Sequence, residues 1–193
     1  MSGQHASQRI AVRVRHLEER LIQAGLLTDA QIDQALERFL ATASPTNGAR
    51  LVARAWVDDR FRELLLADAN AALDELDLGG RGGEHLRVVA NTETQHNVIV
   101  CTLCSCYPLR LLGPSPSWYK SDAYRARVVR EPRAVLAEFG LQLPPEMDIT
   151  VWDASAEARY MVLPRRPTTT ENLTEPDLAR LVTRNGLIGT ATV

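Results

Sequence analysis

The residues of this sequence that could do chemistry are three cysteines, which all lie in the segment CTLCSC: Cys101, Cys104 and Cys106. An odd number of cysteines excludes a complete disulfide framework, and a structural zinc site would need a fourth ligand. The sequence holds no second cysteine cluster, and His85 and His96, although near in the sequence, are each by default structural histidines. Buried idle cysteines are the simplest interpretation of isolated thiols, but three in one hexapeptide indicate metal or redox chemistry instead.

Two kinds of chemistry fit this spacing. Cys101 and Cys104 form a C-x-x-C pair, as in redox enzymes, but such a pair normally begins a helix, and proline and glycine follow here. Alternatively, the peptide nitrogens of Ser105 and Cys106 lie between the sulfurs of Cys104 and Cys106. If both amides lose their protons, these four atoms can surround one metal in a plane, with Cys101 below. Such a set favours a small trivalent transition metal, and five ligands on an octahedral ion leave one position open for catalysis.

The part of the chain before the cysteines predicts helices. Apolar residues recur at helical spacing in the first segment: Ile10, Val14, Leu17 and Leu21. The segment TDAQ, residues 28–31, has the form of a capping box and opens a second helix through about Leu40. Pro45 suits the first turn of a third helix, and helical sequence then continues to the glycine-rich run 79–83. We therefore expect residues 1–78 to form a helical N-terminal region.

The period changes after the glycine-rich run. Residues 86–91 and 97–101 are short β-branched runs that predict strands, and the second strand leads directly into Cys101. Two further strands are expected at 148–153 and 158–164, joined as a hairpin across the segment ASAE. The sequence predicts an α+β fold, in which a helical N-terminal arm precedes a layered α/β metal-binding domain, residues 84–193, with short mixed strands.

Two helical regions complete the prediction. Residues 121–140 predict two helical pieces, with Pro132 beginning the second and Gly140 ending it. A short helix is expected at 175–184, followed by a tail of small residues.

The composition narrows the possible partners. The net charge of −2 argues against nucleic acid as a partner, because phosphate binding requires a basic face. No apolar run is long enough to span a membrane, and the first sixteen residues lack the apolar core of a secretory signal. We therefore expect a cytoplasmic protein, in a reducing compartment where clustered thiols favour metal or redox work.

Several motifs together resemble the α subunit of nitrile hydratase. They are VCTLCSCYP, LLG, WYKS, YRARVVREPRAVLAEFG, VWDASAEARYMVLP and LVTRNGLIG, and they cover residues from Glu84 to Gly189. The signature C-x-L-C-S-C is highly specific for this family. A close relative with the same loop is the metal-bearing subunit of thiocyanate hydrolase, so that activity and a non-catalytic metal-binding or redox paralogue are the alternatives.

The resemblance implies a metal centre and an activity. The metal would be low-spin cobalt(III), or less readily iron(III), held by Cys101, Cys104 and Cys106 with the amides of Ser105 and Cys106. In the family, the cysteines matching Cys104 and Cys106 are oxidised to sulfinic and sulfenic acid, and threonine at the position of Thr102 accompanies cobalt. The reaction converts a nitrile to the amide by Lewis-acid activation of the nitrile or of water, with the Cys106 sulfenate as a possible nucleophile or base.

The resemblance also implies partners. A β subunit, which is split into two chains in some relatives, would supply arginine donors to the oxidised sulfurs, and an activator chaperone would assist metallation. We expect no nucleic-acid or membrane partner.

Other residues give weaker signals. The candidate catalytic residues are Cys106, Ser105 and Tyr107, of which Tyr107 suits a packed aromatic equally well. Four arginines could form a solvated helix face or a subunit interface: Arg125, Arg127, Arg130 and Arg133.

The segment after the loop departs from the family pattern. Leu109 and Arg110 stand where relatives commonly have a Trp-Pro pair. Loss of the indole and gain of a guanidinium predict a larger, polar or heteroaromatic nitrile as substrate, unless both residues turn away from the pocket.

Overall fold

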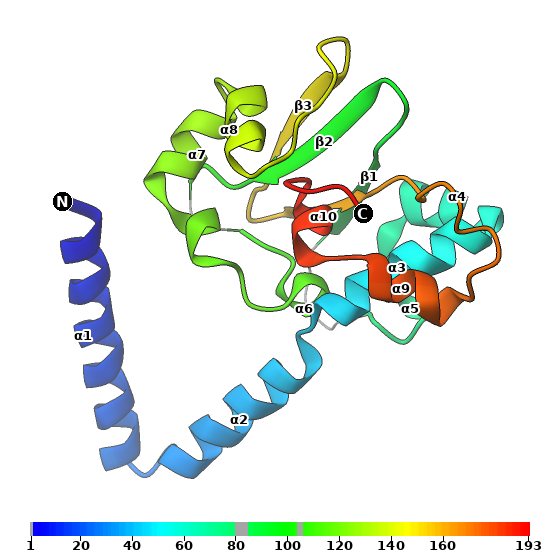
Figure 1. Cartoon of the computed structure of the whole chain (residues 1–193). Coiled ribbons are helices and arrows are strands. Elements are labelled where there is room, and N and C mark those ends of the chain that lie inside the picture. Colours follow the sequence, from blue (N-terminus) through cyan, green and yellow to red (C-terminus); the bar gives the residue numbers. More distant parts are fainter. Residues whose placement is uncertain (1, 80–84, 104–105) are drawn as a thin grey trace. The chain divides into compact units, whose positions relative to one another are not determined.

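The computed structural model describes residues 2–79, 85–103 and 106–193 of the chain (Figure 1). The chain divides into two compact units, one ending at Thr42 and one from Ala43 to Val193. None of the helices in the described residues is both long and apolar enough to cross a membrane.

The first unit holds two helices, and the four strands of the described residues lie in the second unit. The helices are α1 (Ser2–Gln23), α2 (Asp29–Thr42), α3 (Pro45–Val57), α4 (Asp59–Ala67), α5 (Ala69–Glu75), α6 (Leu109–Leu112), α7 (Asp122–Val128), α8 (Pro132–Glu138), α9 (Glu175–Leu181) and α10 (Arg184–Ile188), with a 3₁₀ helix η1 (Ser117–Lys120). The strands are β1 (His85–Ala90), β2 (Gln95–Val100), β3 (Asp148–Asp153) and β4 (Ala158–Leu163). Helices and short strands in this order confirm the predicted α+β class.

The first unit consists of α1 and α2, as the helical spacing predicted. The capping box before α2 forms as expected. The Thr28 amide donates to Gln31 Oε1 at 2.9 Å, and the Gln31 amide donates to Thr28 Oγ1 at 3.2 Å. The apolar stripe of α1 stays exposed within this chain, since Ile10, Val14 and Leu17 are each more than half accessible to solvent.

Three helices with side-chain caps begin the second unit. Ser44, Asp58 and Asp68 accept backbone amide hydrogen bonds at the starts of α3, α4 and α5, at 3.2, 3.0 and 3.1 Å. Helices α4 and α5 pack on β1, and α3 packs on α9 and α6. The boundary between the compact units lies between Thr42 and Ala43, within the predicted helical region 1–78. That residues 84–193 act as a domain of their own stays a prediction.

The four strands form two parallel ladders. Strand β1 pairs with β4, from His85 opposite Ala158, and β2 pairs with β3, from Gln95 opposite Asp148. The predicted β3–β4 hairpin is wrong. The chain does reverse after β3, with the Ser155 amide bonded to the Ala158 carbonyl at 3.0 Å, but the two strands enter different ladders.

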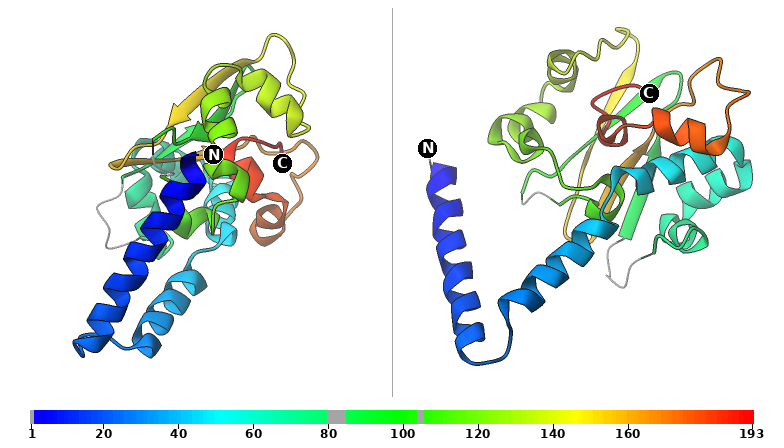
Figure 2. Two further views of the ribbon diagram at one scale, coloured as in Figure 1. Left: turned by 90° about the vertical axis from the view of Figure 1, so that its left-hand side faces the viewer. Right: turned by 60° about the horizontal axis from the view of Figure 1, so that its bottom comes forward.

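Helices cover the strands from two sides. Figures 1 and 2 show α3–α5 with α9 on one side of the strands and α7–α8 on the other. Strand β2 is the most deeply buried element, since Val98, Ile99 and Val100 are at most 1% exposed. Close packing therefore fixes β2, the strand that leads into Cys101.

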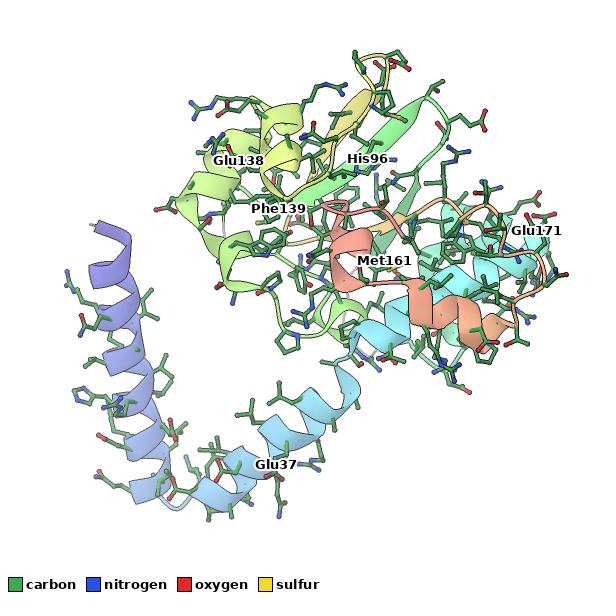
Figure 3. All side chains as sticks on the ribbon, in the orientation of Figure 1. Glu37, His96, Glu138, Phe139, Met161 and Glu171 are labelled. Carbon is green, nitrogen blue, oxygen red and sulfur yellow. The ribbon has the colours of Figure 1, made fainter. Side chains whose placement is uncertain are left out.

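Two polar side chains anchor β2 within this core. His96, labelled in Figure 3, donates from Nε2 to the Gly189 carbonyl at 2.7 Å, and its Nδ1 lies 3.3 Å from Asn91 Nδ2. Asn97 donates to the Ala90 carbonyl at 2.8 Å and accepts from the Trp152 indole at 2.8 Å. These bonds satisfy the buried groups and join β2 to the turn before it, to β3 and to the C-terminal segment.

The later helices agree with the prediction in part. Pro132 begins α8, Gly140 follows it with a positive φ of 84°, and α9 lies within the expected helix at 175–184. The short helices α6 and α10 were not predicted. Helix α10 packs on β4, β2 and α3, so the expected tail of small residues is in fact part of the core.

Candidate metal centre

The cysteine loop begins where β2 ends. Cys101 follows Val100 directly and is fully buried, and Cys106 is half-buried. Two of the predicted ligands, Cys104 and Ser105, lie outside the described residues. The structure therefore places Cys101 and Cys106 on one short loop whose first sulfur is shielded from water.

A carboxylate from the neighbouring strand holds the start of this loop. Asp153 ends β3, opposite Val100 in the parallel ladder. Its Oδ1 accepts the Thr102 amide at 2.9 Å, and its Oδ2 accepts the Thr102 hydroxyl at 2.6 Å. Because both oxygens bond one residue, Asp153 fixes the backbone between the first two cysteines of the loop.

Two buried tyrosines contact the backbone on either side of the loop. The Tyr124 hydroxyl donates to the Ile99 carbonyl at 2.8 Å, and the Tyr119 hydroxyl donates to the Cys106 carbonyl at 3.2 Å. Burial raises the pKa of both phenols, and for Tyr119 the nearby Tyr124 and Cys101 act in the same direction. Both side chains therefore stay protonated donors at neutral pH.

Tyr107, a predicted catalytic residue, is packed beside the loop. It is 5% exposed, its ring meets the Tyr119 ring edge-on with centroids 4.9 Å apart, and its hydroxyl lies 3.5 Å from the Leu112 carbonyl. Burial raises the pKa of Tyr107, while Arg184 opposes that shift. The structure thus gives Tyr107 a packing role, and its part in catalysis stays a prediction.

An aromatic cluster supports these tyrosines. The Trp118 ring lies 4.9 Å from Tyr124 and 4.6 Å from Phe139, measured between ring centroids. Phe139, labelled in Figure 3, follows α8 directly. Trp118 and Tyr119 both pack in this cluster, and Tyr119 also bonds the loop. The 3₁₀ helix η1 ends at Lys120, which is exposed and is the only lysine of the sequence.

The four arginines after the loop make local contacts. Arg125 pairs with Asp122 at 2.6 Å, and Arg127 pairs with Glu131 at 2.7 Å and with Glu138 at 2.6 Å. The carboxylates of these pairs are exposed, whereas Arg125 and Arg127 are only partly exposed. A solvated face and a subunit interface both stay predictions.

Arg133 has a different role from the other arginines of this run. Its guanidinium donates to four backbone carbonyls in the segment before β3, those of Leu143, Pro144, Pro145 and Met147. Arg133 therefore anchors that segment to α8, and no local sequence signal indicated this.

Leu109 and Arg110, which depart from the family pattern, are the first two residues of α6. Arg110 donates to the Gly79 carbonyl at 2.9 Å, and its own carbonyl accepts from the Asn47 side chain at 2.8 Å. The guanidinium is thus engaged with the backbone of the first residue of the glycine-rich run. Leu109 is partly exposed, at 38%, and Leu103 within the loop is 87% exposed.

The donor chemistry of the described residues fits a transition metal. A buried thiol at Cys101 and a half-buried thiol at Cys106 are soft ligands, and the adjacent carboxylate of Asp153 is engaged with Thr102. Among the residues that the structure describes, which exclude Cys104, no group of three or more potential ligands of the His, Cys, Asp and Glu types was found. The loop cysteines are therefore the candidate ligand set of this chain.

The predicted site omitted two residues that the structure brings to the loop. Asp153 and Tyr119 bond Thr102 and Cys106, although they lie 51 and 13 residues from them in the chain. The only available signal was that Asp153 ends a predicted strand, which becomes informative once the pairing of β3 with β2 is known.

Comparison with known proteins is consistent with this site. Residues 8–191 match the family model "Nitrile hydratase, alpha chain". The low-molecular weight cobalt-containing nitrile hydratase subunit alpha of Rhodococcus rhodochrous is 52% identical over 184 residues, which cover 95% of this chain and 89% of that protein. The cobalt-containing subunit alpha of Pseudonocardia thermophila is 47% identical, over 97% and 93% of the two chains.

Solved structures agree with the sequence relatives. A double mutant of the Fe-type nitrile hydratase from Comamonas testosteroni Ni1 has a TM-score of 0.88 and 42% identity, over 96% of this chain and 90% of that one. A recombinant thiocyanate hydrolase with partially modified cobalt centres has a TM-score of 0.84 and 41% identity, over 94% and 88%.

Proposed function

Because this chain belongs to the family of nitrile hydratase alpha chains, we propose that it is the metal-bearing catalytic subunit of a cobalt nitrile hydratase, which hydrates a nitrile to the amide. The observation that carries this proposal is the family match over residues 8–191 together with an intact C-x-L-C-S-C loop. The gamma subunit of thiocyanate hydrolase is related to this chain at a lower identity of 43%, over 91% of this chain and 76% of that subunit. Hydration of a nitrile is therefore the main activity.

The cofactor is cobalt, as in the two relatives named above. We infer that it is low-spin and trivalent, with Cys101, Cys104 and Cys106 as sulfur ligands and the amides of Ser105 and Cys106 as nitrogen ligands. When bound, such a metal supplies Lewis acidity towards a nitrile or water. Threonine at position 102 and the cobalt relatives support cobalt over iron, although one similar structure is of the Fe type.

The residues of this chain prepare the loop for that chemistry. Burial of Cys101 excludes water from one side of the site, and the bonds from Asp153 hold Thr102. We propose that, with dioxygen as the oxidant, Cys104 matures to the sulfinate and Cys106 to the sulfenate. The half-buried position of Cys106 supports its access to a substrate, towards which a sulfenate oxygen would act as nucleophile or base.

An alpha subunit works with a beta subunit, so this chain has that partner. We further propose an activator that delivers the metal, and a beta function that a single chain or two chains supply. Oxidised sulfurs are anionic and require charge-assisted donors, which supports a partner that contributes arginines. The three reduced thiols that assembly requires support a cytoplasmic location.

Co-expression of the chain with its beta subunit in cobalt medium tests this function. We expect amide from nitriles, no carbonyl sulfide from thiocyanate, and one cobalt per alpha chain by elemental analysis. Cys106→Ala should lose both cobalt and turnover, because its sulfur donor is removed while only the amide nitrogen remains. Leu103→Ala, in the same loop but with an exposed side chain, should keep its cobalt. Full cobalt content in Cys106→Ala would exclude this ligand assignment.

The substrate is the least determined part of the proposal. The exposure of Leu109 supports a larger nitrile as substrate. The guanidinium of Arg110 bonds the Gly79 carbonyl, which argues against its contact with the substrate. In the same complex, kcat/KM for a nucleoside nitrile should exceed that for a small aliphatic nitrile, and Leu109→Trp should reduce the difference. A preference for the small nitrile that this variant does not alter would disprove the idea.

A further inference from the structure

Tyr119 reaches the last cysteine of the loop from an element that carries no predicted ligand. It lies in η1, is fully buried, and donates its hydroxyl proton to the Cys106 carbonyl oxygen at 3.2 Å. Its ring is fixed by neighbours, because the centroids of Tyr107 and Tyr124 lie 4.9 and 5.8 Å away. A phenol held in this way is a rigid donor with little rotamer freedom to lose.

A second phenol offers a direct comparison. Tyr124 donates to the Ile99 carbonyl at 2.8 Å, on the opposite side of the cysteine loop. Ile99 lies within β2 and pairs with Trp152, so the ladder fixes its position whether or not Tyr124 is present. Cys106 lies outside the helices and strands. The two hydrogen bonds are therefore alike in type, but only the bond from Tyr119 holds a backbone that no ladder fixes.

The consequence for Cys106 follows from its covalent structure. The Cα atom of Cys106 carries the amide nitrogen and the Cβ–Sγ arm, and its carbonyl carbon is bonded to the same Cα atom. A hydrogen bond that fixes this carbonyl therefore restricts the positions of both the nitrogen and the sulfur. Groups that hold metal ligands from behind set the ligand geometry and typically change metal affinity when they are removed.

We propose that Tyr119 is a positioning residue for Cys106, which it holds ready for the metal through the Cys106 carbonyl. The inference rests on the proposed function, since it takes Cys106 as a ligand. Tyr119 is fully buried and bonds the carbonyl of Cys106, so it would act through this residue. The bond joins two residues of this chain and includes no metal atom, so its effect should be measurable in the metal-free chain.

The test compares Tyr119→Phe with Tyr124→Phe in the full chain. Each variant keeps its ring and loses one buried hydrogen bond, so both should lower the melting temperature by similar amounts. In the metal-free, reduced chain, alkylation by iodoacetamide is followed for each cysteine by mass spectrometry. Buried Cys101 reports global opening, and the ratio of Cys106 to Cys101 alkylation reports the loop. We expect this ratio to rise several-fold in Tyr119→Phe alone.

The assembled complex provides the second measurement. When each variant is co-expressed with the beta subunit under limiting cobalt, Tyr119→Phe should bind cobalt about 10- to 100-fold more weakly and shift the sulfur-to-cobalt absorption band. Tyr124→Phe should match the wild type in both. Measurements are made equally far below each melting temperature, so that a less stable variant remains informative.

The outcomes separate the two proposals. An unchanged alkylation ratio and band in Tyr119→Phe, or equal changes in Tyr124→Phe, would overturn the positioning role. A wild-type complex that takes up no cobalt would instead refute the proposed function, and the alkylation ratio would still decide whether Tyr119 orders Cys106.

Discussion

At the scale of single residues, Asp153 holds the start of the cysteine loop through both of its carboxylate oxygens. Its two oxygens bond the amide and hydroxyl of Thr102, between the first two cysteines. Asp153→Asn keeps the size of the side chain but replaces one acceptor oxygen with a donor group. Because the pair is exposed, we expect a modest cost of about 1 kcal/mol in unfolding free energy, and faster loss of cobalt on dialysis.

The control for this variant lies on the same strand. Asp148→Asn changes an exposed carboxylate at the other end of β3, away from the cysteine loop. Its cobalt retention should equal that of the wild type. If the two variants lose cobalt at the same rate, the bonds to Thr102 do not order the ligand loop.

The sequence suggested a ligand set, which stays a prediction, but not the residues that contact the loop. The spacing of Cys101, Cys104 and Cys106 fits one metal by the geometry of the backbone itself, so no knowledge of the fold was required. Tyr119 and Asp153 act across space, and only the packing of η1 and β3 brings them to the loop. An isolated sequence records no such contacts, so neither residue was among the predicted site residues.

At the scale of elements, the strands show where local sequence reasoning stops. All four strands were predicted from β-branched runs, and their pairing was not. Four residues separate β3 from β4, a length typical of a hairpin. Parallel pairing with β2 and β1 replaces the hairpin because the core selects the partners. The short helices α6 and α10 were missed because four or five residues carry too little periodicity to detect.

Strand β2 also contains a residue whose titration should affect stability. Burial lowers the pKa of His96 from its ordinary value of 6.5, and the bond to the Gly189 carbonyl opposes this shift in part. The unfolded chain therefore takes up a proton at a higher pH than the folded chain. Neutral His96 therefore contributes to the free energy of unfolding. This stabilisation is complete above about pH 6.5, and it is lost as the pH falls below that value towards the pKa of the folded chain.

Unfolding in urea at pH 8 and at pH 5.5 measures this effect. The wild type should lose unfolding free energy between the two values, and His96→Gln should lose less because its side chain does not titrate. His16→Gln removes an exposed histidine from α1 and should keep the wild-type difference. A pH dependence that His96→Gln leaves unchanged would show that other groups cause it.

At the scale of the whole molecule, the chain keeps its core in one unit. Every buried apolar residue of the central cluster lies between Ala49 and Ile188, and α1 exposes Ile10, Val14 and Leu17. We expect residues 43–193 to fold without the first unit, with a cooperative melting transition within about 5 °C of the full chain. The N-cap Ser44 stays in this fragment. Circular dichroism and a thermal melt provide the measurement.

The complementary fragment should behave differently. A peptide of residues 1–42 should show little helix in water, because isolated helices of this length are only marginally stable. Strong helicity in that peptide, or a fragment 43–193 that fails to melt cooperatively, would show that the two units depend on each other. The apolar stripe of α1 was predicted as part of a helix, and its exposure became known only from the structure.

Lys120 has a practical consequence for labelling. It is the only lysine of the chain, it is exposed, and it directly follows Tyr119. Amine-reactive dyes therefore have one side-chain target, besides the chain's amino terminus, and that target adjoins the phenol that bonds Cys106. A fluorophore at this position offers an optical readout of loop ordering during metal uptake, without an engineered attachment site and without consuming any of the three thiols.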